Sequence, residues 1–575
     1  MPREDPVTKT LLELIALKFS RSIRSECGGA RLHVMGTPGR WLQSYSGVRA
    51  KIGPGSKVLL EDELFAFRHA YCYAVSRLQA NPAPEARIVL ARDPRPTGEQ
   101  LLDAQAEGIA CAFRDLGVRL DLINLGIVST PVWQHAVRQF QAHGGAMITA
   151  SHNPLDNNGW KYATGIETVA VDPAPPGALL SAAEMGLLIR AANAFSPTPR
   201  DEPSVPDERP DAREDAIHRY VEFIAEHYNT DVHNVKVVLD PNGGAASGIA
   251  SRVFERLGVT PVVLNDEPGQ PGHVIDVEST LPDGSHVLEP LAARVREEGA
   301  LFGLAYDFDA DRGNLTYVDR AGKAAIPSPQ MAAAINVAIA LSLHRRAGDT
   351  RPPAVVASDA TSYRVHAIAD QFGAEVHEVE TGEINVVTKM RDLDALGYRT
   401  VVGVEGPNGG TIFAGTTCRD GSLVGAGALL ACADDGLRAI AADALKGQLG
   451  TGLIGFVDLL PTQRTLAAKG EAPGDWEDVV DRLESRFPEL FVRFLARDWG
   501  MFTFHYSYTR YVGRDRPRGK SYGWKVRLES PKGRGFLWIR GSKTERGVVR
   551  VVADAPTLVQ AEALLSLGQN LLATD

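Results

Sequence analysis

The stretch Thr149-Ala150-Ser151-His152-Asn153-Pro154 contains a serine whose surroundings suit chemistry. It follows Gly144 to Ile148, a run of small and apolar residues that predicts a short buried strand ending in a turn. Pro154 stiffens this turn, because its ring fixes φ and stops regular structure. A hydroxyl on such a turn is exposed and rigidly placed, as a nucleophile or phosphate carrier requires. An ordinary Asn-Pro loop with a surface serine explains the six residues equally well. The rest of the sequence is needed to distinguish these two interpretations.

A second group of residues that could do chemistry is Asp307-Phe308-Asp309-Ala310-Asp311-Arg312. Three carboxylates at alternate positions can converge through oxygen on one hard cation. The stretch is not a calcium EF-hand, because Arg312 and Val318 stand where that motif needs Gly and Glu. A small octahedral Mg²⁺ held by two or three carboxylates, with room for a phosphate oxygen, fits better than a solvated acidic turn. Apolar runs on both sides predict buried strands, where unpaired like charges would repel strongly.

Two further loops could bind a phosphorylated sugar. Arg540 to Arg546 combines cations, hydroxyls and glycine, as a phosphate dianion needs, although an ordinary charged hairpin loop explains it equally well. Gly403 to Gly410 carries Glu405 and Asn408 on a glycine-rich turn, which could bind sugar hydroxyls or be a plain turn. The sequence has no Walker A motif. The residues two before and two after Ser151 are not the glycines of a nucleophile elbow, so acyl transfer is disfavoured.

The segments that must position these loops share one order three times: apolar strand, polar turn, helix, glycine, second strand. This order is typical of βαβ units with parallel pairing, and each glycine suits the end of a helix. We infer three related α/β domains in series. The strands are expected at 87–91 and 118–123, at 235–239 and 259–263, and at 354–357 and 374–379, with intervening helices that end at Leu116, Leu257 and Phe372.

The remaining segments do not follow this order of strands and helices. Phe195 to Arg213 is rich in Pro, Asp and Glu and predicts an exposed linker, after which Asp215 to Glu226 has helical periodicity. Met501 to Lys520 is aromatic and basic, and we expect a solvated loop or, alternatively, a flap over an anionic ligand. The last part predicts a smaller α+β domain, with strands at 523–528, 535–539 and 548–552 and helices at 476–487 and 557–572.

The bulk composition narrows the class of protein. A net charge of −10 makes it unfavourable for the protein as a whole to bind nucleic acid, which is also negatively charged. The five cysteines are scattered and form no C-x-x-C pair, which argues for a reducing compartment and against a zinc or redox site. The N-terminus lacks a secretory signal, Thr10 to Phe19 reads as an amphipathic surface helix, and no stretch is apolar for long enough to span a bilayer. We expect a cytoplasmic protein without nucleic-acid or membrane partners; the sequence leaves its oligomeric state open.

Taken together, these residues resemble the α-D-phosphohexomutases, the family of phosphoglucomutase and phosphomannomutase. The four loops occur in family order, so the likeness covers nearly the whole chain. The serine stretch continues into Asn158-Gly159-Trp160-Lys161, where the family also has Asn-Gly-x-Lys. Shorter matches are Ser46-Gly47-Val48-Arg49, Arg92 to Gly98, and Ser129-Thr130-Pro131.

The resemblance implies an enzyme that interconverts a hexose 1-phosphate and a hexose 6-phosphate through a phosphoserine at Ser151 and a bisphosphorylated sugar. Mg²⁺ would be held by the three aspartates and by an oxygen at Ser151, and a hexose 1,6-bisphosphate would be the activator. Lys161 and Arg49 would handle protons or stabilise charge. The implied site residues are Ser151, Lys161, Arg49 and His152 for catalysis, Asp307, Asp309 and Asp311 for the metal, and Arg312, Glu383, Glu405, Asn408, Arg540, Ser542, Lys543 and Thr544 for sugar phosphates.

Several residues depart from the family pattern. Phe308 stands where the family usually has Gly, which should crowd one side of the site. The sugar loop lacks the second acid, carries an extra residue around Pro407 and has Gly410 where His is common. The identity of the sugar therefore cannot be inferred from the resemblance. The remaining departures are Glu383, Lys543 and Arg546, where the family has Asp or His, Gly and Pro.

We thus expect an α/β fold, with three related α/β domains in series plus a smaller C-terminal α+β domain around a central cleft. The phosphoserine, metal-binding, sugar-binding and phosphate-binding loops would lie in residues 1–200, 201–320, 321–460 and 461–575. Two alternatives to a mutase are a sugar-1,6-bisphosphate synthase, which would use the same serine with another phosphoryl donor, and a non-catalytic sugar-phosphate sensor. Intact Ser151, the three aspartates and Lys161 argue against a sensor, since a pure binder needs no phosphoryl carrier.

Overall fold

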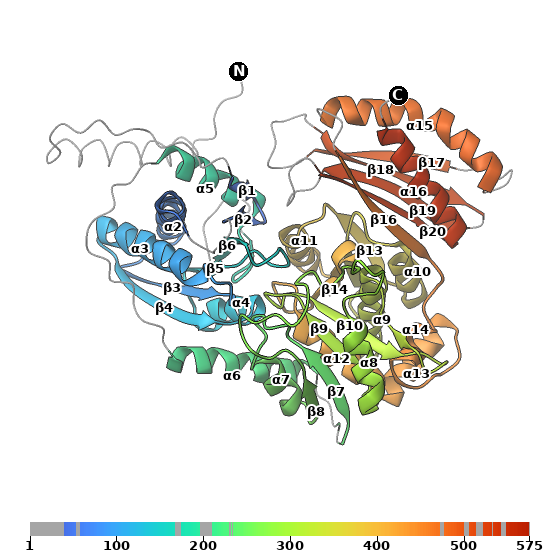
Figure 1. Cartoon of the computed structure of the whole chain (residues 1–575), viewed down its shortest axis with the longest axis horizontal. Helices are drawn as coiled ribbons and strands as arrows, with labels where there is room; N and C mark the ends of the chain where they lie inside the picture. The colour runs from blue at the N-terminus through green and yellow to red at the C-terminus, as the bar shows by residue number, and fades with distance from the viewer. Residues whose placement is uncertain are drawn as a thin grey trace.

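The structure is a computed structural model of the 575-residue chain. Within the residues it describes, the chain forms four sheets covered by helices, three of them in consecutive α/β units and the fourth at the C-terminal end (Figure 1). No helix among these residues is long and apolar enough to cross a membrane. The described residues are 40–52, 58–166, 174–195, 210–228, 232, 234–471, 476–498, 505–512, 521–531, 533–541 and 548–573.

The first sheet has the strand order β1-β2-β6-β5-β3-β4. Strands β3, β4 and β5 pair in parallel, whereas β6, β2 and β1 add an antiparallel half. The serine stretch therefore begins where a parallel strand, β5, ends and turns back into its antiparallel neighbour. The elements are β1 (Leu42–Ser44), β2 (Gly47–Lys51), α2 (Leu60–Ala80), β3 (Glu85–Arg92), α3 (Gly98–Leu116), β4 (Arg119–Ile127), α4 (Thr130–Gln139), β5 (Gly144–Ile148), β6 (Asn157–Thr164) and α5 (Ala182–Ala194).

The second sheet has the order β11-β10-β9-β7-β8. Strands β7, β8 and β9 are parallel, and β10 returns antiparallel to β9, so that the three-aspartate stretch is the turn of a hairpin. The elements are α6 (Pro210–His227), β7 (Lys236–Asp240), α7 (Ala250–Arg256), β8 (Thr260–Val263), α8 (Glu289–Glu298), β9 (Gly303–Tyr306), β10 (Gly313–Val318) and β11 (Ala324–Ala325).

The third sheet has the order β13-β12-β14-β15. Strand β14 is parallel to β12, and β15 is antiparallel to β14 across the short helix η1, which carries the predicted sugar loop. The elements are α9 (Pro329–Ala347), β12 (Pro353–Ser358), α10 (Tyr363–Phe372), β13 (Glu375–Val379), α11 (Glu383–Ala395), β14 (Arg399–Glu405), η1 (Gly406–Asn408), β15 (Gly410–Phe413), α12 (Gly421–Ala433), α13 (Asp435–Leu445) and α14 (Gly452–Val457).

The fourth sheet is antiparallel throughout, in the order β16-β20-β19-β18-β17, with two helices on it. It is attached to the third unit through buried polar groups. Asp554 on β20 accepts from Ser362 Oγ (2.7 Å) and the Tyr363 amide (3.0 Å) at the start of α10. The elements are β16 (Arg464–Glu471), α15 (Trp476–Asp498), β17 (His505–Val512), β18 (Ser521–Ser530), β19 (Gly533–Gly541), β20 (Val548–Ala555) and α16 (Leu558–Leu572).

The predicted strand, helix and glycine pattern is confirmed in all three units. Helices α3 and α10 end at Gly117 (φ 67°) and Gly373 (φ 70°), where only a residue that tolerates the left-handed region fits without strain. Each parallel pair continues into antiparallel strands, so the sheets are mixed. A single hydrophobic cluster runs through all three units and includes Val89 of β3, Leu304 of β9 and Val355 of β12.

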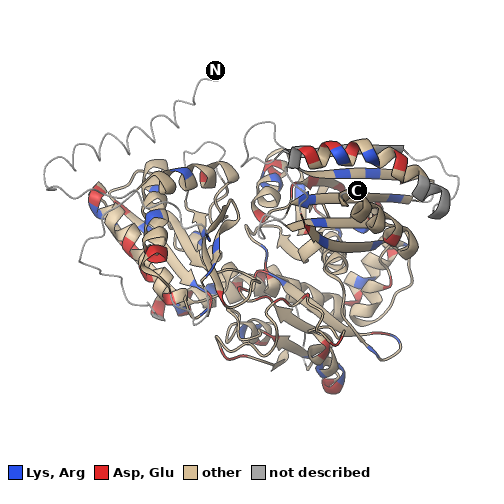
Figure 2. Ribbon diagram, turned by 45° about the horizontal axis from the view of Figure 1, so that its top comes forward, with Lys and Arg blue, Asp and Glu red and all other residues tan. Residues whose placement is uncertain are grey.

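Two sequence predictions are corrected. Helix α6 begins at Pro210, within the predicted exposed linker, and Ala212 is buried in the shared hydrophobic cluster. The basic, aromatic stretch is not simply a solvated loop, because His505–Val512 forms β17 and pairs with β18. Residues 501–504 and 513–520 of that stretch, and the predicted helix at 10–19, lie outside the described residues. In Figure 2, acidic and basic residues are interspersed on the helices of the α/β units and of the C-terminal unit.

Candidate active site

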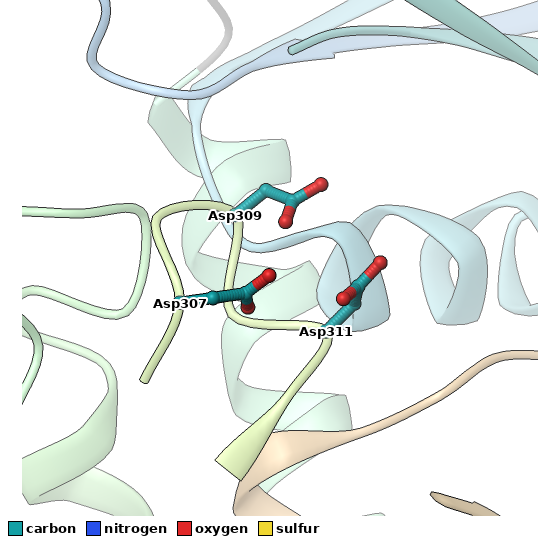
Figure 3. A group of neighbouring side chains, drawn as sticks. All are labelled: Asp307, Asp309 and Asp311. Atoms are coloured by element: carbon teal, nitrogen blue, oxygen red, sulfur yellow. The ribbon is translucent and has the colours of Figure 1, made fainter. Parts of the chain in front are cut away.

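The three predicted metal-binding aspartates converge at the turn between β9 and β10. One carboxylate oxygen from each of Asp307, Asp309 and Asp311 lies within 4.8 Å of the others, and all three residues are fully buried (Figure 3). Ala310 adopts φ 60° at the tip of the turn, which turns the alternate side chains toward one another. The backbone amide of Arg312 donates to Asp307 Oδ1 (3.0 Å) and fixes the first aspartate.

Cations from three different units surround these carboxylates. Lys161 Nζ on β6 donates to Asp309 Oδ2 (2.8 Å) and lies 3.3 Å from Asp311 Oδ2. Arg312 Nε donates to Asp307 Oδ2 (3.0 Å), and Arg419 Nη2, which comes from the third unit, donates to Asp311 Oδ2 (2.5 Å). Burial and the nearby Asp311 charge raise the pKa of Asp307 well above its usual value. Burial also raises the pKa of Asp309, but Lys161 and the arginines outweigh it and lower that pKa.

Two carboxylate oxygens of this turn accept no hydrogen bond from the surrounding cations and could bind a metal ion. Asp309 Oδ1 and Asp311 Oδ1 are buried without a hydrogen-bond partner. Unsatisfied buried carboxylate oxygens are costly unless a cation binds them. Carboxylate oxygens are the ligands that Mg²⁺ prefers, so the donor set agrees with the predicted metal.

Ser151, in the first unit, lies against the turn between β9 and β10, which we call the metal-binding turn after its predicted role. Its backbone has φ 54°, a strained value for a residue with a side chain, and its amide donates to Thr149 Oγ1 (2.8 Å). The Ser151 hydroxyl donates to Asp307 Oδ2 at 3.4 Å. The serine is predicted to be exposed, but the residue is buried, with 3% exposure, and its hydroxyl contacts the β9–β10 turn of the second unit.

Arg95 holds the serine turn in shape. Its guanidinium donates to the carbonyls of Pro154 (2.6 Å), Asn153 (2.7 Å) and Ser151, and its Nε donates to the buried Asp93 (3.0 Å). The Arg95 guanidinium also lies 5.2 Å from the centre of the Phe308 ring. The unusual phenylalanine of the metal-binding turn therefore packs against the arginine that supports the serine turn.

The other two predicted catalytic residues lie near this group. Burial lowers the pKa of Arg49, while the charges of Asp309 and Asp311 raise it. Burial, with the charges of Arg312 and Arg49, lowers the pKa of His152 well below its usual value. His152 is therefore neutral, and its buried Nδ1 has no hydrogen-bond partner.

The predicted sugar-binding acids are joined by a residue that sequence reasoning missed. Arg419, in the loop before α12, donates through Nε to Glu383 Oε2 (3.1 Å) and through Nη1 to Glu405 Oε2 (3.0 Å). The Asn408 side chain forms a hydrogen bond within its own turn, where its Oδ1 accepts from the Gly410 amide (2.8 Å). Burial raises the pKa of Glu383 to about 7. No sequence motif marks Arg419; only the fold brings it to the acids.

The predicted phosphate-binding loop is described only in part. Arg540, at the end of β19, is buried, and its Nη2 lies 4.0 Å from Glu380 Oε1 in the third unit. The register pairs Arg540 with Arg550 of β20, a second arginine that the sequence prediction missed. The charge of Arg550 is also among those that lower the pKa of His152, after burial and the charges of Arg312 and Arg49. Ser542, Lys543 and Thr544 lie outside the described residues.

Comparisons with known proteins agree with this arrangement. Sequence models of the phosphoglucomutase/phosphomannomutase α/β/α domains I, II and III match residues 42–169, 218–322 and 333–446, more than half of the chain. A phosphoglucosamine mutase of Corynebacterium glutamicum strain R is 29% identical over 351 residues, which are 60% of this chain and 70% of that protein. The corresponding enzyme of Rhodococcus jostii is 31% identical over 321 residues, 55% and 65% of the two chains.

Solved structures share the whole fold. A phosphoglucomutase/phosphomannomutase family protein of Burkholderia thailandensis matches with a TM-score of 0.62 at 20% identity, over 92% of this chain and 96% of that one. The phosphoglucomutase parafusin of Paramecium, in an open form, matches with a TM-score of 0.61 at 17% identity, over 94% and 96% of the chains.

Proposed function

The chain belongs to the phosphoglucomutase/phosphomannomutase family, and from this premise we propose that it is a phosphohexomutase that interconverts a hexose 1-phosphate and a hexose 6-phosphate. The observation that carries the proposal is the meeting of Ser151 with the three-aspartate turn across two units, with Ser151 Oγ 3.4 Å from Asp307. A strained serine held beside a metal-binding carboxylate cluster is suited to carry a phosphoryl group.

The proposed reaction has two transfers. In the first, the bond between phosphorus and Ser151 Oγ breaks as a bond forms to the free hydroxyl of the hexose monophosphate. The proton that this hydroxyl releases is balanced by the proton that the other sugar oxygen takes up when the second transfer frees it. The resulting hexose 1,6-bisphosphate turns round, and its other phosphoryl group returns to Ser151 Oγ, which releases the isomer. The same bisphosphate would phosphorylate a resting serine, which is why we propose it as the activator.

Residues of this chain place and stabilise the transferring group. Asp307, Asp309 and Asp311 would hold Mg²⁺, which neutralises charge on a transferring phosphoryl group when it is bound. Lys161 ion-pairs with two of these aspartates, so we assign it an electrostatic role beside Ser151 rather than that of a base. Arg540, with the loop that follows it, would hold the phosphate that does not react.

The proposal is tested by phosphorus NMR of the protein with a panel of hexose 1-phosphates, Mg²⁺ and a trace of hexose 1,6-bisphosphate. Conversion of at least one 1-phosphate signal into the corresponding 6-phosphate signal supports a mutase. Net accumulation of bisphosphate from another donor would identify a bisphosphate synthase instead, and binding without any conversion would identify a sensor. Ser151→Ala is the control for contaminating mutase activity.

A further inference from the structure

The two predicted sugar-binding acids share one cationic partner. Within the described residues, Arg419 is the cation that ion-pairs with Glu383 and with Glu405. The remaining contacts of these carboxylates are neutral, and they include the Gly382 amide, which donates to Glu405 Oε1 (2.8 Å). The side chains of both acids are almost completely buried, at 5% and 2% exposure. Arg419 therefore occupies carboxylate oxygens that would otherwise be open to a cationic group of a ligand.

The arginine is placed where a ligand can approach it. Its side chain is 14% exposed, more than either glutamate that it contacts. It also contacts Asp311 of the metal-binding turn, so it stands between the proposed metal and the sugar loop. A guanidinium keeps its charge at any physiological pH, and its five N–H groups allow it to donate to the three carboxylates and still face a ligand.

A glycine makes room for this arrangement. A Cβ atom added at Gly410 would lie 2.3 Å from Arg419 Cδ and 2.9 Å from Asn408 Oδ1. Gly410 pairs with Glu405 across the β14–β15 hairpin, and a side chain at 410 would force the Arg419 side chain to shift. The position of Arg419 therefore depends on the absence of a side chain at position 410 of the sugar loop.

We propose that Arg419 is a specificity-determining residue that makes the sugar site select a neutral hexose phosphate over an amino-sugar phosphate, which carries an ammonium group. The inference rests on the proposed function, because it assigns Glu383 and Glu405 to sugar binding. With Arg419 in place, one oxygen of each acid is engaged by its guanidinium, and an ammonium on the ring would have to compete with that group of like charge at close range. Hydroxyl groups meet no such repulsion and can still donate to Glu383 Oε1, which is buried without a partner.

The test is calorimetric binding of three sugar 6-phosphates with Mg²⁺, in a Ser151→Ala background that prevents turnover. Glucose 6-phosphate should bind at least tenfold more tightly than glucosamine 6-phosphate. The third ligand, 2-deoxyglucose 6-phosphate, has neither hydroxyl nor ammonium and separates charge from a lost hydrogen bond. Arg419→Gln should reduce the preference for glucose over glucosamine at least tenfold, without a matching gain for the deoxy sugar. Arg419→Lys keeps the charge and should retain the original preference.

Gly410→Ala provides a second route to the same result, because it displaces Arg419 without removing it, and it should shift the preference in the same direction. Magnesium affinity, titrated without sugar, shows whether each variant retains its metal-binding turn. Equal binding of glucose and glucosamine 6-phosphates by the parent, or an unchanged ratio in Arg419→Gln, overturns the inference and leaves the mutase proposal standing. If no sugar phosphate binds the parent protein, both proposals fail together.

Discussion

At the scale of single residues, the site is a cluster of buried carboxylates that accept hydrogen bonds from cationic side chains. Each aspartate of the metal-binding turn accepts a hydrogen bond from a cation of the protein through one oxygen, and in two of them the second oxygen has no hydrogen-bond partner. Lys161 and Arg419 therefore leave oxygens of Asp309 and Asp311 available to the proposed metal. The sequence could predict the aspartates and Ser151, because their spacing is local. It could not predict Arg419, whose contacts with Asp311, Glu383 and Glu405 exist only after folding.

Asp309→Asn tests the metal-binding turn. The substitution removes one charge and keeps the size of the side chain, so the metal should bind more weakly and Lys161 should lose its nearest carboxylate. We expect the mutase rate at fixed Mg²⁺ to fall at least tenfold, in line with the several kcal/mol that a bound metal supplies to charge stabilisation. The measurement is the initial rate against Mg²⁺ concentration, with calorimetric Mg²⁺ binding as a second readout. Full activity in excess chelator would contradict the metal assignment.

At the scale of elements, the strand–helix–strand units were predictable and their antiparallel edges were not. The parallel pairs β3–β4, β7–β8 and β12–β13 follow from apolar runs separated by a helix and a glycine. The hairpins that carry the serine turn and the metal-binding turn join strands through special backbone conformations, at Ser151 and Ala310, that no apolar periodicity marks. Strand β17 was missed because its basic, aromatic composition resembles that of a loop.

Arg540→Ala tests the role of the β19–β20 loop. Loss of a charged hydrogen bond to the non-reacting phosphate should weaken binding of the sugar phosphate by about 1.5–3 kcal/mol. Phosphorylation of Ser151 by acetyl phosphate should remain largely intact, since that small donor does not need the distal site. Calorimetric binding and phosphorylation rates measure the two effects.

The matched control for this test is Arg534→Ala, which changes an exposed arginine near the other end of β19 and should alter neither quantity. Equal losses of sugar binding and of serine phosphorylation in Arg540→Ala, or unchanged sugar binding, would show that the loop has another role.

At the scale of the whole molecule, the site depends on how the units are joined. Serine, metal-binding and sugar loops come from three sheets that share one hydrophobic cluster, while the fourth sheet has its own core and meets the third unit near Asp554. We therefore predict that the C-terminal unit moves on this contact and closes over the substrate, which would exclude water from the phosphoserine. The sequence implied that the four loops must meet, but which contacts join the units follows only from packing.

The contact between the first unit and helix α6 contains a buried histidine, from which we predict how folding stability depends on pH. His135 is buried at this contact, and burial, with the charges of Arg138 and Arg219, lowers its pKa to about 3. In the unfolded chain a histidine takes up a proton below about pH 6.5, so between pH 7.5 and 5.5 the unfolded state binds more protons and stability falls with falling pH. This residue should account for about 1.4 kcal/mol of the loss over that range.

Urea unfolding at pH 7.5 and pH 5.5 measures this effect. His135→Gln should reduce the loss of unfolding free energy between the two pH values by that amount, whatever its effect on stability at pH 7.5. The control is His218→Gln, at an exposed position on α6, which should behave like the parent protein. The same pH dependence in His135→Gln as in the parent would show that His135 is not held neutral.

Ser151 is proposed to carry the transferable phosphoryl group, and its phosphorylation can be measured. The protein is incubated with a hexose 1,6-bisphosphate and Mg²⁺, and intact mass and peptide mapping locate any added phosphate. We predict a single phosphate on Ser151, which disappears when excess hexose monophosphate is added, and no phosphate in Ser151→Ala. Phosphate on another residue, or full mutase activity in Ser151→Ala, would contradict this assignment.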